Sequence, residues 1–430
     1  MKIKRKYYIE TYGCQMNVSD SELIISVLDN DGYEQVDSID DADIILFNTC
    51  SVREHAEQRV LGRVSNERHR KIQKPSLKIG LLGCMAQRIG ERLVSDDLGI
   101  DFAVGVDQYH ALPEILRETC GSELGFDSEQ IYEGIIPKHQ GEHCAFITIM
   151  RGCNNFCSYC IVPYVRGRER SRPYSDIKKD IEQALSSNMF DITLLGQNVN
   201  SYLFDGMAFP ALLRQIEKDF EGIKRLRFIT SHPKDLSDEL IETMANSSIL
   251  CNHIHLPMQS GDNKVLRRMN RSYSIEDYML IVDKLRKAVP DIALTTDLIA
   301  GFPGESKEQF EATLSAMERI GFDYAFCFKY SPREGTEAAN YENQVPESER
   351  LKRLQEMIEL QRKITLDKYR EMIGKEVEVY VEGFSKKSKE KVSGKSRDFK
   401  ICVLSGDAND IGTIKRAKVL NATAGTLICE

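Results

Sequence analysis

Short apolar runs alternate with amphipathic stretches over about the first 120 residues of the chain. Four of the runs have the length and composition of buried strands, and the stretches between them have the periodicity of helices. The four runs are KYYIETYGC, ADIILFNTC, LKIGLLGC and DFAVG. This regular alternation predicts a parallel sheet with helices packed on its faces.

A second alternation follows a polar, irregular link at about residues 121–142. It contains six candidate strands with helical stretches between them: Cys144–Met150, Asp191–Leu195, Arg225–Thr230, Asn252–Leu256, Ile292–Ile299 and Tyr324–Tyr330. Six successive strand–helix units predict an open or partial α/β barrel, and such barrels place their sites at the carboxyl ends of the strands. A charged helix from about Glu347 to Met372 closes this part of the chain.

The character of the sequence changes again from Gly374 to the end of the chain. The short β-type runs EVEVYVEGF, FKICVLS and TLICE are separated by Gly, Asn and Asp turns, which predicts a small barrel of strands. The pattern as a whole predicts an α/β protein of three domains. They are an N-terminal parallel-sheet domain at residues 1–122, a partial (β/α)6 barrel at 139–372 and a small all-β barrel at 373–430.

The composition is that of an ordinary globular protein, with 41% hydrophobic and 29% charged residues in a chain of 430. No window of about 18 apolar residues is present, and no signal-peptide core follows the basic N-terminus. We therefore expect no membrane partner and a cytoplasmic location. The net charge of −8 does not favour a nucleic-acid partner for the chain as a whole, so any such partner must be recognised by local basic patches.

Twelve cysteines are many for a cytoplasmic protein, in which clustered cysteines more often bind metal or carry out redox chemistry than form disulfides. Cys14, Cys50 and Cys84 each end one of the first three predicted strands. The carboxyl ends of parallel strands share one edge of a sheet, and open α/β sheets bind their ligands there. We therefore expect these three cysteines to meet in space although they are far apart in sequence.

A second cysteine set follows the first strand of the predicted barrel with the spacing C-x3-C-x2-C: Cys153, Cys157 and Cys160. A structural zinc site uses four ligands, and no fourth ligand is obvious nearby. Three cysteines suit a [4Fe–4S] cluster with one open iron, which the amino and carboxylate groups of S-adenosylmethionine can chelate before the cofactor is cleaved to a 5′-deoxyadenosyl radical. Zinc and a group of reactive thiols are the alternatives.

Cys153, Cys157 and Cys160, with the aromatic Tyr159 before the last of them, resemble the signature of radical S-adenosylmethionine enzymes. The segments ETYGCQMNVSDSE, FNTCSVREHAEQR and LLGCMAQR are similar to the three cysteine motifs of the methylthiotransferase family. The resemblance covers nearly the whole chain. It implies a second [4Fe–4S] cluster on Cys14, Cys50 and Cys84, a radical S-adenosylmethionine core in the central domain and a TRAM-type RNA-binding barrel at the C-terminus.

Within that family, GCQMNVSDSE and NTCSVREHAEQRV are most similar to the branch that acts on tRNA bearing N6-isopentenyladenosine. This implies insertion of a methylthio group at C2 of that base, beside the anticodon at position 37, with one S-adenosylmethionine as methyl donor and another as radical source. It also implies an electron donor such as flavodoxin or ferredoxin, and proteins that deliver sulfur or iron–sulfur clusters. Threonylcarbamoyl-adenosine in tRNA, a ribosomal-protein aspartate, and a non-catalytic RNA-binding iron–sulfur or zinc protein are the alternatives.

Five further residues are candidates for contact with S-adenosylmethionine: Tyr159, Gly196, Gln197, Ser231 and Gln259. Tyr159 belongs to the cysteine signature, and the other four lie at the ends of predicted strands. Turn chemistry or helix capping is the alternative explanation for these polar and glycine residues. The sequence does not identify a catalytic side chain.

Six basic residues are candidates for RNA contact: Arg166, Arg168, Lys386, Lys387, Lys389 and Lys391. The arginines belong to VRGRERSRP, where guanidinium groups suit the cofactor carboxylate or RNA phosphates. The lysines belong to KKSKEKVSGKSRDFK, in which seven of fifteen residues are basic and two are acidic, as expected for a hairpin that contacts an RNA backbone. A solvated, salt-bridged loop is the alternative for each stretch.

Overall fold

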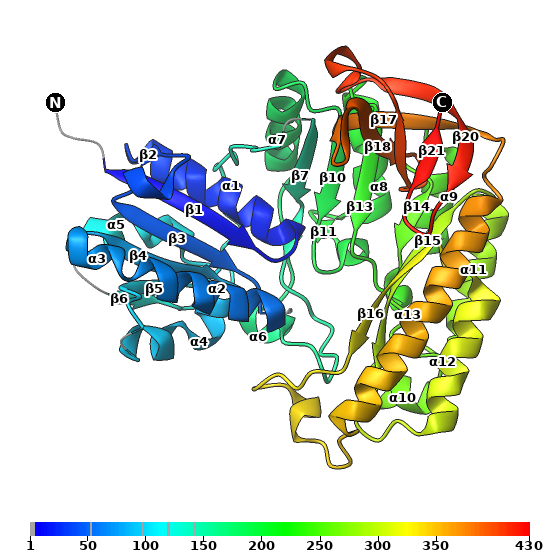
Figure 1. The fold of residues 1–430 in the computed structure, drawn as a ribbon, viewed down its shortest axis with the longest axis horizontal. Coiled ribbons are helices and arrows are strands. Elements are labelled where there is room, and N and C mark those ends of the chain that lie inside the picture. The colour runs from blue at the N-terminus through cyan, green and yellow to red at the C-terminus, as the bar shows by residue number, and fades with distance from the viewer. Residues whose placement is uncertain (1–4, 52–53, 97, 118–120, 142) are drawn as a thin grey trace.

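The computed structural model describes residues 5–51, 54–96, 98–117, 121–141 and 143–430. Figure 1 shows three parts in chain order: an N-terminal sheet flanked by helices, a central curved sheet with helices around it, and a small C-terminal barrel of strands. The N-terminal part and the C-terminal barrel lie against different sides of the central part.

The N-terminal domain is a six-stranded parallel sheet in the order β2-β1-β3-β4-β5-β6. Its strands are β1 Lys6–Tyr12, β2 Glu34–Gln35, β3 Ile44–Thr49, β4 Lys78–Gly83, β5 Phe102–Val104 and β6 Gly121–Glu123. Its helices are α1 Gln15–Asn30, α2 Glu54–Glu67, α3 Arg70–Gln73, α4 Cys84–Ser95 and α5 Leu112–Arg117. α1 and α5 cover one apolar face of the sheet, and α2 and α4 cover the other.

The predicted parallel sheet is confirmed, and the short edge strands β2 and β6 extend the four strands that the pattern indicated. β6 begins at Gly121, so the first residues of the stretch predicted as an irregular link pair instead with β5. Edge strands of two or three residues carry too few apolar positions to be recognised by alternation.

The central domain contains six parallel strands that follow one another in chain order: β7 Cys144–Thr148, β10 Asp191–Leu195, β13 Arg225–Ile229, β14 His253–His255, β15 Ala293–Ala300 and β16 Tyr324–Lys329. They form two three-stranded sheets, β13-β10-β7 and β14-β15-β16, and a parallel bridge between Leu226 and Leu250 connects them. The result is the open half-barrel that the strand–helix pattern predicted.

Helices cover the outside of this half-barrel over the largest apolar core of the molecule. They are α7 Tyr174–Ser186, α8 Phe209–Asp219, α9 Asp238–Asn246, α11 Ile275–Ala288, α12 Lys307–Ile320 and α13 Glu347–Arg370. Two short helices, α6 Val162–Arg166 and α10 Asn263–Arg268, lie in loops. The remaining short strands pair as β8 Met150–Arg151 with β9 Arg170–Ser171, and β11 Leu203–Phe204 with β12 Met207–Ala208.

The C-terminal strands close into a barrel in the order β17-β18-β19-β21-β20. They are β17 Glu376–Ser385, β18 Ser388–Ser396, β19 Ile401–Ser405, β20 Ile414–Ala422 and β21 Leu427–Cys429. The barrel has its own apolar core, to which α13 contributes Tyr369. The predicted fold class, with a parallel-sheet domain, a partial α/β barrel and a small all-β barrel, is confirmed.

Buried arginines fix the C-terminal barrel to the amino end of the central strands. The Arg225 guanidinium donates to the Glu378 carbonyl at 2.9 Å, and that of Arg227 donates to the Ser396 carbonyl at 3.0 Å. Arg225 is 1% exposed and Arg227 is 4% exposed. Charge-assisted hydrogen bonds of this kind are stronger than neutral ones, so they fix the barrel firmly at this end. The loop of the second cysteine set lies at the opposite, carboxyl end of the central strands.

Candidate functional site: two cysteine centres and a group of buried polar atoms

Three neighbouring strands of the N-terminal sheet end in a cysteine, and the structure brings these ends together. Cys14 follows β1 and precedes α1, Cys50 follows β3, and Cys84 is the first residue of α4 after β4. A Cβ at Gly13, whose φ is +138°, would lie 2.5 Å from the Cβ of Cys50. The glycine therefore allows the first two cysteine loops to approach one another closely.

The thiols of this N-terminal trio interact with one another and with one guanidinium group. A hydrogen bond from the Cys50 side chain lowers the pKa of the Cys14 thiol to about 6, and the charge of Arg166 contributes. Burial raises the pKa of Cys84, against the opposing effect of Arg166. The Nε of Arg166 donates to the Cys84 Sγ at 3.2 Å. A fixed cation beside clustered sulfur atoms favours the thiolate form, which is the form that binds metal.

Arg166 comes from α6 of the central domain and also holds a carboxylate of the N-terminal domain. It donates to Asp20 of α1 at 2.6 Å, and Arg151 contacts the other oxygen of that carboxylate at 2.9 Å. Asp20 is completely buried, and the two arginines are 3% and 4% exposed. Burial alone would raise the pKa of the Asp20 carboxyl, but the two guanidinium groups outweigh it and hold that pKa below its ordinary value.

The prediction that Arg166 contacts RNA phosphates is therefore corrected. Its side chain is buried at the junction of the two domains, and its charge is paired with Asp20. The neighbouring Arg168 is different: it is exposed, and its guanidinium carbon lies 4.2 Å from the centroid of the Phe156 ring. Arg170 and Arg172 are salt-bridged, as the alternative predicted, but their side chains are buried and pair with the buried Asp107 and Asp180, so they do not form a solvated loop.

The second cysteine set lies in the loop between β8 and α6, at the carboxyl end of the central strands. Cys153 and Cys157 are buried, and Cys160 is half-buried. Burial raises the pKa of the Cys153 thiol to about 11 and that of Cys160 to about 12. A metal centre bound there has to displace these protons, so its affinity depends on pH.

A second buried arginine contacts this loop. Nη1 of Arg271 donates to the Cys157 Sγ at 3.5 Å, and Nη2 donates to the Pro257 carbonyl at 2.7 Å. Each cysteine set thus has one buried guanidinium that donates to one of its sulfur atoms. Hydrogen bonds to ligand sulfurs tune iron–sulfur centres. Sequence reasoning missed both contacts, because neither arginine lies within a cysteine motif.

A group of buried polar atoms lies at the carboxyl ends of β10, β13 and β14. Within the part of the chain that the structure describes, these atoms have no hydrogen-bond partner: Gln197 Oε1, Asn200 Oδ1 and Nδ2, Ser231 Oγ and Gln259 Oε1. The three strand ends are linked by backbone hydrogen bonds, from Val199 to Thr230 at 3.0 Å and from Ser231 to His255 at 3.3 Å. Buried polar groups in native proteins are nearly always paired, so this group indicates a site for a polar ligand.

Three of these residues, Gln197, Ser231 and Gln259, were predicted as cofactor contacts, and Asn200 was not. The orphaned oxygens of the two glutamines are acceptors, and the Ser231 hydroxyl can donate or accept. This donor and acceptor set fits the ammonium, carboxylate and ribose hydroxyl groups of S-adenosylmethionine. Position alone indicated the three residues, because each lies just beyond a predicted strand.

Gly196 and Tyr159 were also predicted as cofactor contacts. A Cβ at Gly196 would lie 2.6 Å from the Cγ of Met150, so packing between two strand ends already requires a glycine there. Tyr159 packs edge-on against Phe302, with 6.4 Å between the ring centroids. Gly196 therefore packs against the strand that precedes the cysteine loop, and Tyr159, within the loop, packs against a neighbouring apolar cluster.

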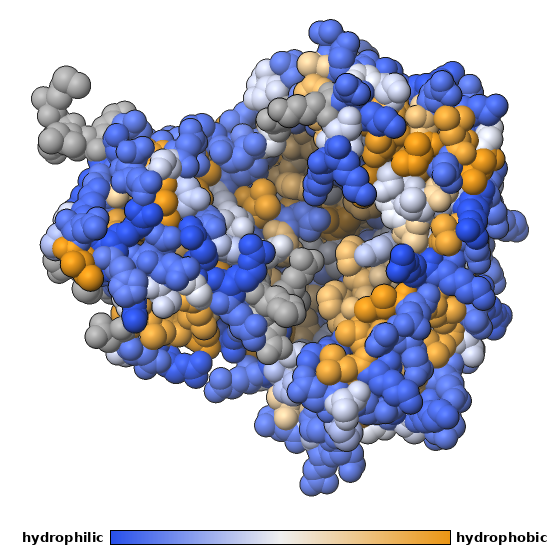
Figure 2. Space-filling view, viewed as in Figure 1, coloured by the Kyte–Doolittle hydropathy of each residue, from blue (hydrophilic) through white to orange (hydrophobic). Residues whose placement is uncertain are grey.

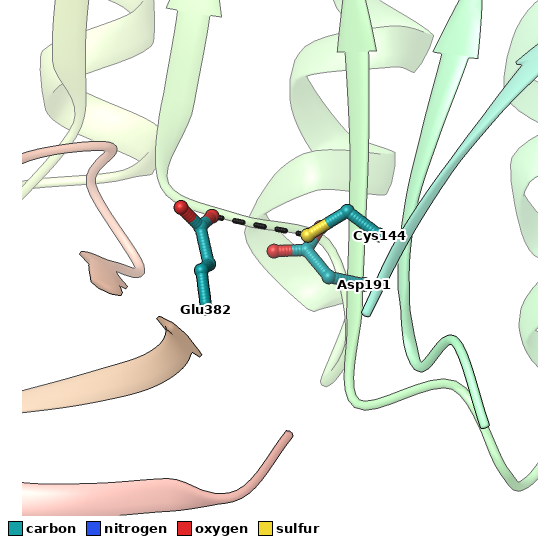
Figure 3. Close-up of side chains that lie close together, drawn as sticks. All are labelled: Cys144, Asp191 and Glu382. Carbon is teal, nitrogen blue, oxygen red and sulfur yellow. Dashed lines mark hydrogen bonds between the residues drawn. The ribbon is translucent and has the colours of Figure 1, made fainter. Parts of the chain in front are cut away.

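Figure 3 shows one further group of ligand-type side chains, Cys144, Asp191 and Glu382, which join β7, β10 and β17. One ligand atom from each lies within 4.8 Å of the other two. Two cations already balance the carboxylates: Lys395 Nζ is 2.7 Å from Glu382, and Arg227 Nε is 3.4 Å from Asp191. We interpret this group as part of the ionic contact that holds the C-terminal barrel.

The basic stretch after residue 385 forms part of the β17–β18 hairpin. Lys386, Lys387 and Lys391 are exposed, whereas the side chain of Lys389 lies outside the described residues. Other basic residues of the stretch point inward: Lys395 pairs with Glu382, and the buried Lys400 pairs with Asp323 at 3.2 Å. The basic surface is thus confined to the tip of the hairpin.

Comparisons with known proteins agree with this geometry. The sequence model of the uncharacterized protein family UPF0004 matches residues 6–105, and that of the radical SAM superfamily matches residues 147–317. A protein of Thermoanaerobacter sp. (strain X514), named tRNA-2-methylthio-N(6)-dimethylallyladenosine synthase, is 46% identical over 98% of this chain and 91% of its own length. A protein of the same name from Parabacteroides distasonis is 44% identical over 99% of this chain and 95% of its own length.

The chain belongs to this synthase family.

The predicted membership of the methylthiotransferase family of radical S-adenosylmethionine enzymes is therefore confirmed. S-adenosylmethionine and [4Fe–4S] clusters are the cofactors of such an enzyme, as the cysteine spacing and the family motifs predicted. The two cysteine sets and the orphaned polar atoms supply thiolates and hydrogen-bonding groups that suit both cofactors.

Solved structures with low sequence identity share the fold of this member of the synthase family. A radical S-adenosylmethionine methyltransferase, TsrM from Kitasatospora setae, covers 78% of the chain with a TM-score of 0.59 and 14% identity, and 77% of that structure is matched. The cobalamin-dependent radical enzyme OxsB covers 84% of the chain with a TM-score of 0.54, and 56% of that structure is matched. Among the described residues, no helix is both long and apolar enough to span a membrane.

Proposed function

We propose that the protein transfers a methylthio group to C2 of N6-isopentenyladenosine in tRNA, beside the anticodon at position 37. One S-adenosylmethionine would donate the methyl group, and a second would be the source of the radical. The observation that carries this proposal is identity of 42–46% with curated synthases of that name over nearly the whole chain, which includes both cysteine sets. Among the described residues, the first set lies at the ends of three neighbouring strands, and the second lies in one loop at the carboxyl end of the central strands.

We assign Cys14, Cys50 and Cys84 to an auxiliary [4Fe–4S] cluster, and Cys153, Cys157 and Cys160 to the cluster that binds S-adenosylmethionine. When bound, these groups supply the radical and the sulfur for the reaction. The chain supplies thiolates, buried loops that exclude water, and one guanidinium donor to each set. Tertiary burial of both loops protects radical chemistry from side reactions with solvent.

We further propose that S-adenosylmethionine lies beside Tyr159 and Gly196 and is held by Gln197, Ser231 and Gln259. The orphaned glutamine oxygens would accept hydrogen bonds from the ammonium group or the ribose hydroxyls. The Ser231 hydroxyl would donate to the carboxylate. Such bonds would orient the cofactor at the carboxyl ends of the central strands, where the loop of the second cysteine set also lies.

The RNA contacts that we propose are Arg168 and the lysines of the hairpin tip, Lys386, Lys387, Lys389 and Lys391. Arg168 is exposed beside the cysteine loop, and three of the lysines are exposed on the barrel. Lysines of this kind contact phosphates and provide affinity without sequence preference. The domain boundaries 1–122, 139–372 and 373–430, a cytoplasmic location, a flavodoxin- or ferredoxin-type electron donor and sulfur-delivery proteins remain part of the proposal.

The test is a reaction under anaerobic conditions with protein that has been reconstituted with iron and sulfide. Reductant, S-adenosylmethionine and tRNA bearing N6-isopentenyladenosine are added, and digested nucleosides are analysed by mass spectrometry. A methylthio adduct of the prenylated adenosine is the expected product. Formation of 5′-deoxyadenosine without that adduct would indicate a different substrate, either threonylcarbamoyl-adenosine or a ribosomal-protein aspartate. Absence of both products would contradict the cluster assignment.

A further inference from the structure

Three aromatic side chains project from one face of β16, the last strand of the central half-barrel. Tyr324, Phe326 and Phe328 occupy alternate positions and are 45%, 42% and 40% exposed. The residues between them, Ala325 and Cys327, pack into the core beneath the helices. Side chains at alternate positions of a strand share one face, so the three rings form a continuous surface, here called the aromatic stripe.

The aromatic stripe lies on the inner side of the half-barrel, at its open edge. Among the described strands, β16 pairs only with β15. Figure 2 shows that this face of the molecule is hollowed between the N-terminal and central domains, and hydrophobic residues gather on the wall of the hollow over the region of β16 in Figure 1. An exposed row of aromatic rings beside a hollow is typical of a binding surface.

The aromatic stripe is continuous with the candidate site. Phe328 is in register with Ile299 of β15. Ile299 packs against the apolar cluster that contains Phe302, and Tyr159 of the cysteine loop packs against the same cluster. The carboxyl end of the stripe therefore leads to the second cysteine set, and Tyr324, at the other end of the strand, lies farthest along the strand from it.

A polar pair accompanies the aromatic stripe at its middle position. His255 Nε2 lies 3.4 Å from an Asp297 oxygen, and the His255 ring is 6.0 Å from the Phe326 ring. Asp297 is in register with Phe326. The surface thus offers aromatic faces together with one carboxylate and one imidazole, which can bond to the edge of a heteroaromatic base.

We propose that the aromatic stripe binds the prenylated adenine of the substrate RNA and distinguishes it from unmodified adenine. This inference rests on the proposed function and names the residues that select its substrate. Bases splayed out of RNA loops stack on aromatic side chains, and a five-carbon apolar chain gains affinity from the same rings. In adenine, C2 and C6 flank N1, so the C2–H bond and the C6–N6 bond point in diverging directions. With C2 toward the cysteine loop, the chain on N6 extends along the stripe, away from the loop.

The experiment measures binding, so it is independent of turnover. Reconstituted protein is titrated anaerobically, without reductant, into two fluorescent anticodon stem–loops that differ only in the N6-isopentenyl group. We expect the wild-type protein to bind the prenylated stem–loop about tenfold or more tightly, since a pocket for several methylenes discriminates to that extent. Phe326→Ala and Phe328→Ala should reduce this preference to about twofold or less, with the affinity for the unmodified stem–loop nearly unchanged.

Two further variants separate stacking and packing from general effects on the fold. Phe326→Leu keeps an apolar side chain and should keep most of the preference. Leu280→Ala removes an exposed apolar side chain, 57% exposed, from α11 on the outer side of the domain, and should leave the preference unchanged. Circular dichroism should show intact folding of all four variants, since the removed side chains are largely exposed.

Several outcomes would overturn the inference. The first is an undiminished preference in both alanine variants, and the second is equal binding of the two stem–loops by the wild-type protein, which would leave the RNA-binding part of the proposed function intact. The third is a concentration-dependent dimer that Phe326→Ala dissociates in sedimentation experiments, because a second copy would then cover the stripe. Failure of the wild-type protein to bind either stem–loop would contradict both the proposed function and this inference.

Discussion

Arg166 is close to both cysteine sets, to one in the sequence and to the other in space. It follows the second set by six residues in the sequence, yet its Nε donates to the Cys84 sulfur of the first set at 3.2 Å. A guanidinium that donates to a ligand sulfur stabilises the more negative, reduced state of an iron–sulfur centre. The position of Arg166 therefore predicts an effect on the reduction potential of the auxiliary centre.

We expect Arg166→Lys to lower that potential by tens of millivolts, on the order of the free energy of one charge-assisted hydrogen bond. Lysine keeps a positive charge near Asp20 but loses the directed Nε donor. The measurement is a redox titration followed by electron paramagnetic resonance, in a background of Cys153→Ala, Cys157→Ala and Cys160→Ala that leaves only the auxiliary centre. Arg168→Lys, at an exposed position, is the matched control; equal potentials in all three proteins would contradict the role of Arg166.

The residues of the site differ in how far sequence could predict them. Gln197, Ser231 and Gln259 could be predicted because each lies just after a strand, where the topology of parallel sheets places ligand contacts. Arg166 was predicted to contact RNA because it lies in a basic stretch beside the second cysteine set. Its actual partner, Asp20, is 146 residues away in the sequence. Long-range pairs of this kind leave no local signal, so their burial becomes visible only in the folded chain.

At the scale of elements, strand order positions the N-terminal cysteines. β1, β3 and β4 are neighbours in the sheet, so Cys14, Cys50 and Cys84 reach one edge of it although 70 residues separate the first from the last. The helix–strand periodicity was sufficient to predict this arrangement. It was not sufficient for β6, whose three residues are too few for a periodic pattern.

The two cysteine sets lie on different elements, the first on strands of the N-terminal sheet and the second in a loop of the central domain. We therefore expect their functions to be separable. The triple variant Cys14→Ala, Cys50→Ala, Cys84→Ala should retain formation of 5′-deoxyadenosine, lose methylthio transfer, and contain about half of the wild-type iron, because one of two four-iron centres is removed. Iron analysis and mass spectrometry of nucleosides and cofactor products are the measurements. The corresponding variant of Cys153, Cys157 and Cys160 is the control and should lose cofactor cleavage. Loss of cleavage in the N-terminal variant as well would contradict separate roles.

The β17–β18 hairpin is the element that we expect to contact the RNA backbone. Replacement of Lys386, Lys387 and Lys391 by alanine should weaken tRNA binding. It should also reduce the slope of log affinity against log salt concentration by about two to three, since each phosphate contact contributes a little under one. The control removes the same charge from the outer helices, with Lys287, Lys307 and Lys352 replaced by alanine. A salt slope that falls equally in both variants would indicate an effect of net charge alone.

At the scale of the whole molecule, buried charged residues connect the three domains. Arg225 and Arg227 hold the C-terminal barrel on the amino end of the central strands, while Asp20 holds the N-terminal domain through Arg151 and Arg166. Sequence patterns identified the three domains but gave no information on how they pack. Charged residues are usually exposed, so their burial between domains could not be inferred from residue type.

Asp20 is the residue whose removal tests this packing most directly. Its carboxylate is completely buried and neutralises two guanidinium groups of the central domain, so Asp20→Asn leaves buried positive charge without compensation while the side-chain volume is nearly unchanged. We expect a loss of about 3–5 kcal/mol in the free energy of unfolding, which urea denaturation measures. Asp31→Asn, which removes a partly exposed ion pair with Arg117, should cost less than about 1 kcal/mol.

The pH dependence of the same variant gives an independent check with a defined sign. The guanidinium groups hold the pKa of Asp20 below its ordinary value, so the stability that Asp20 contributes is present above the pKa of the unfolded chain, about 4. This contribution is lost as the pH falls through the lower pKa of the folded protein. The wild-type protein should therefore lose more stability than Asp20→Asn between pH 5 and strongly acidic conditions, and the two stability curves should converge. Parallel curves over that range would show that Asp20 does not carry the ionised charge on which the domain junction depends.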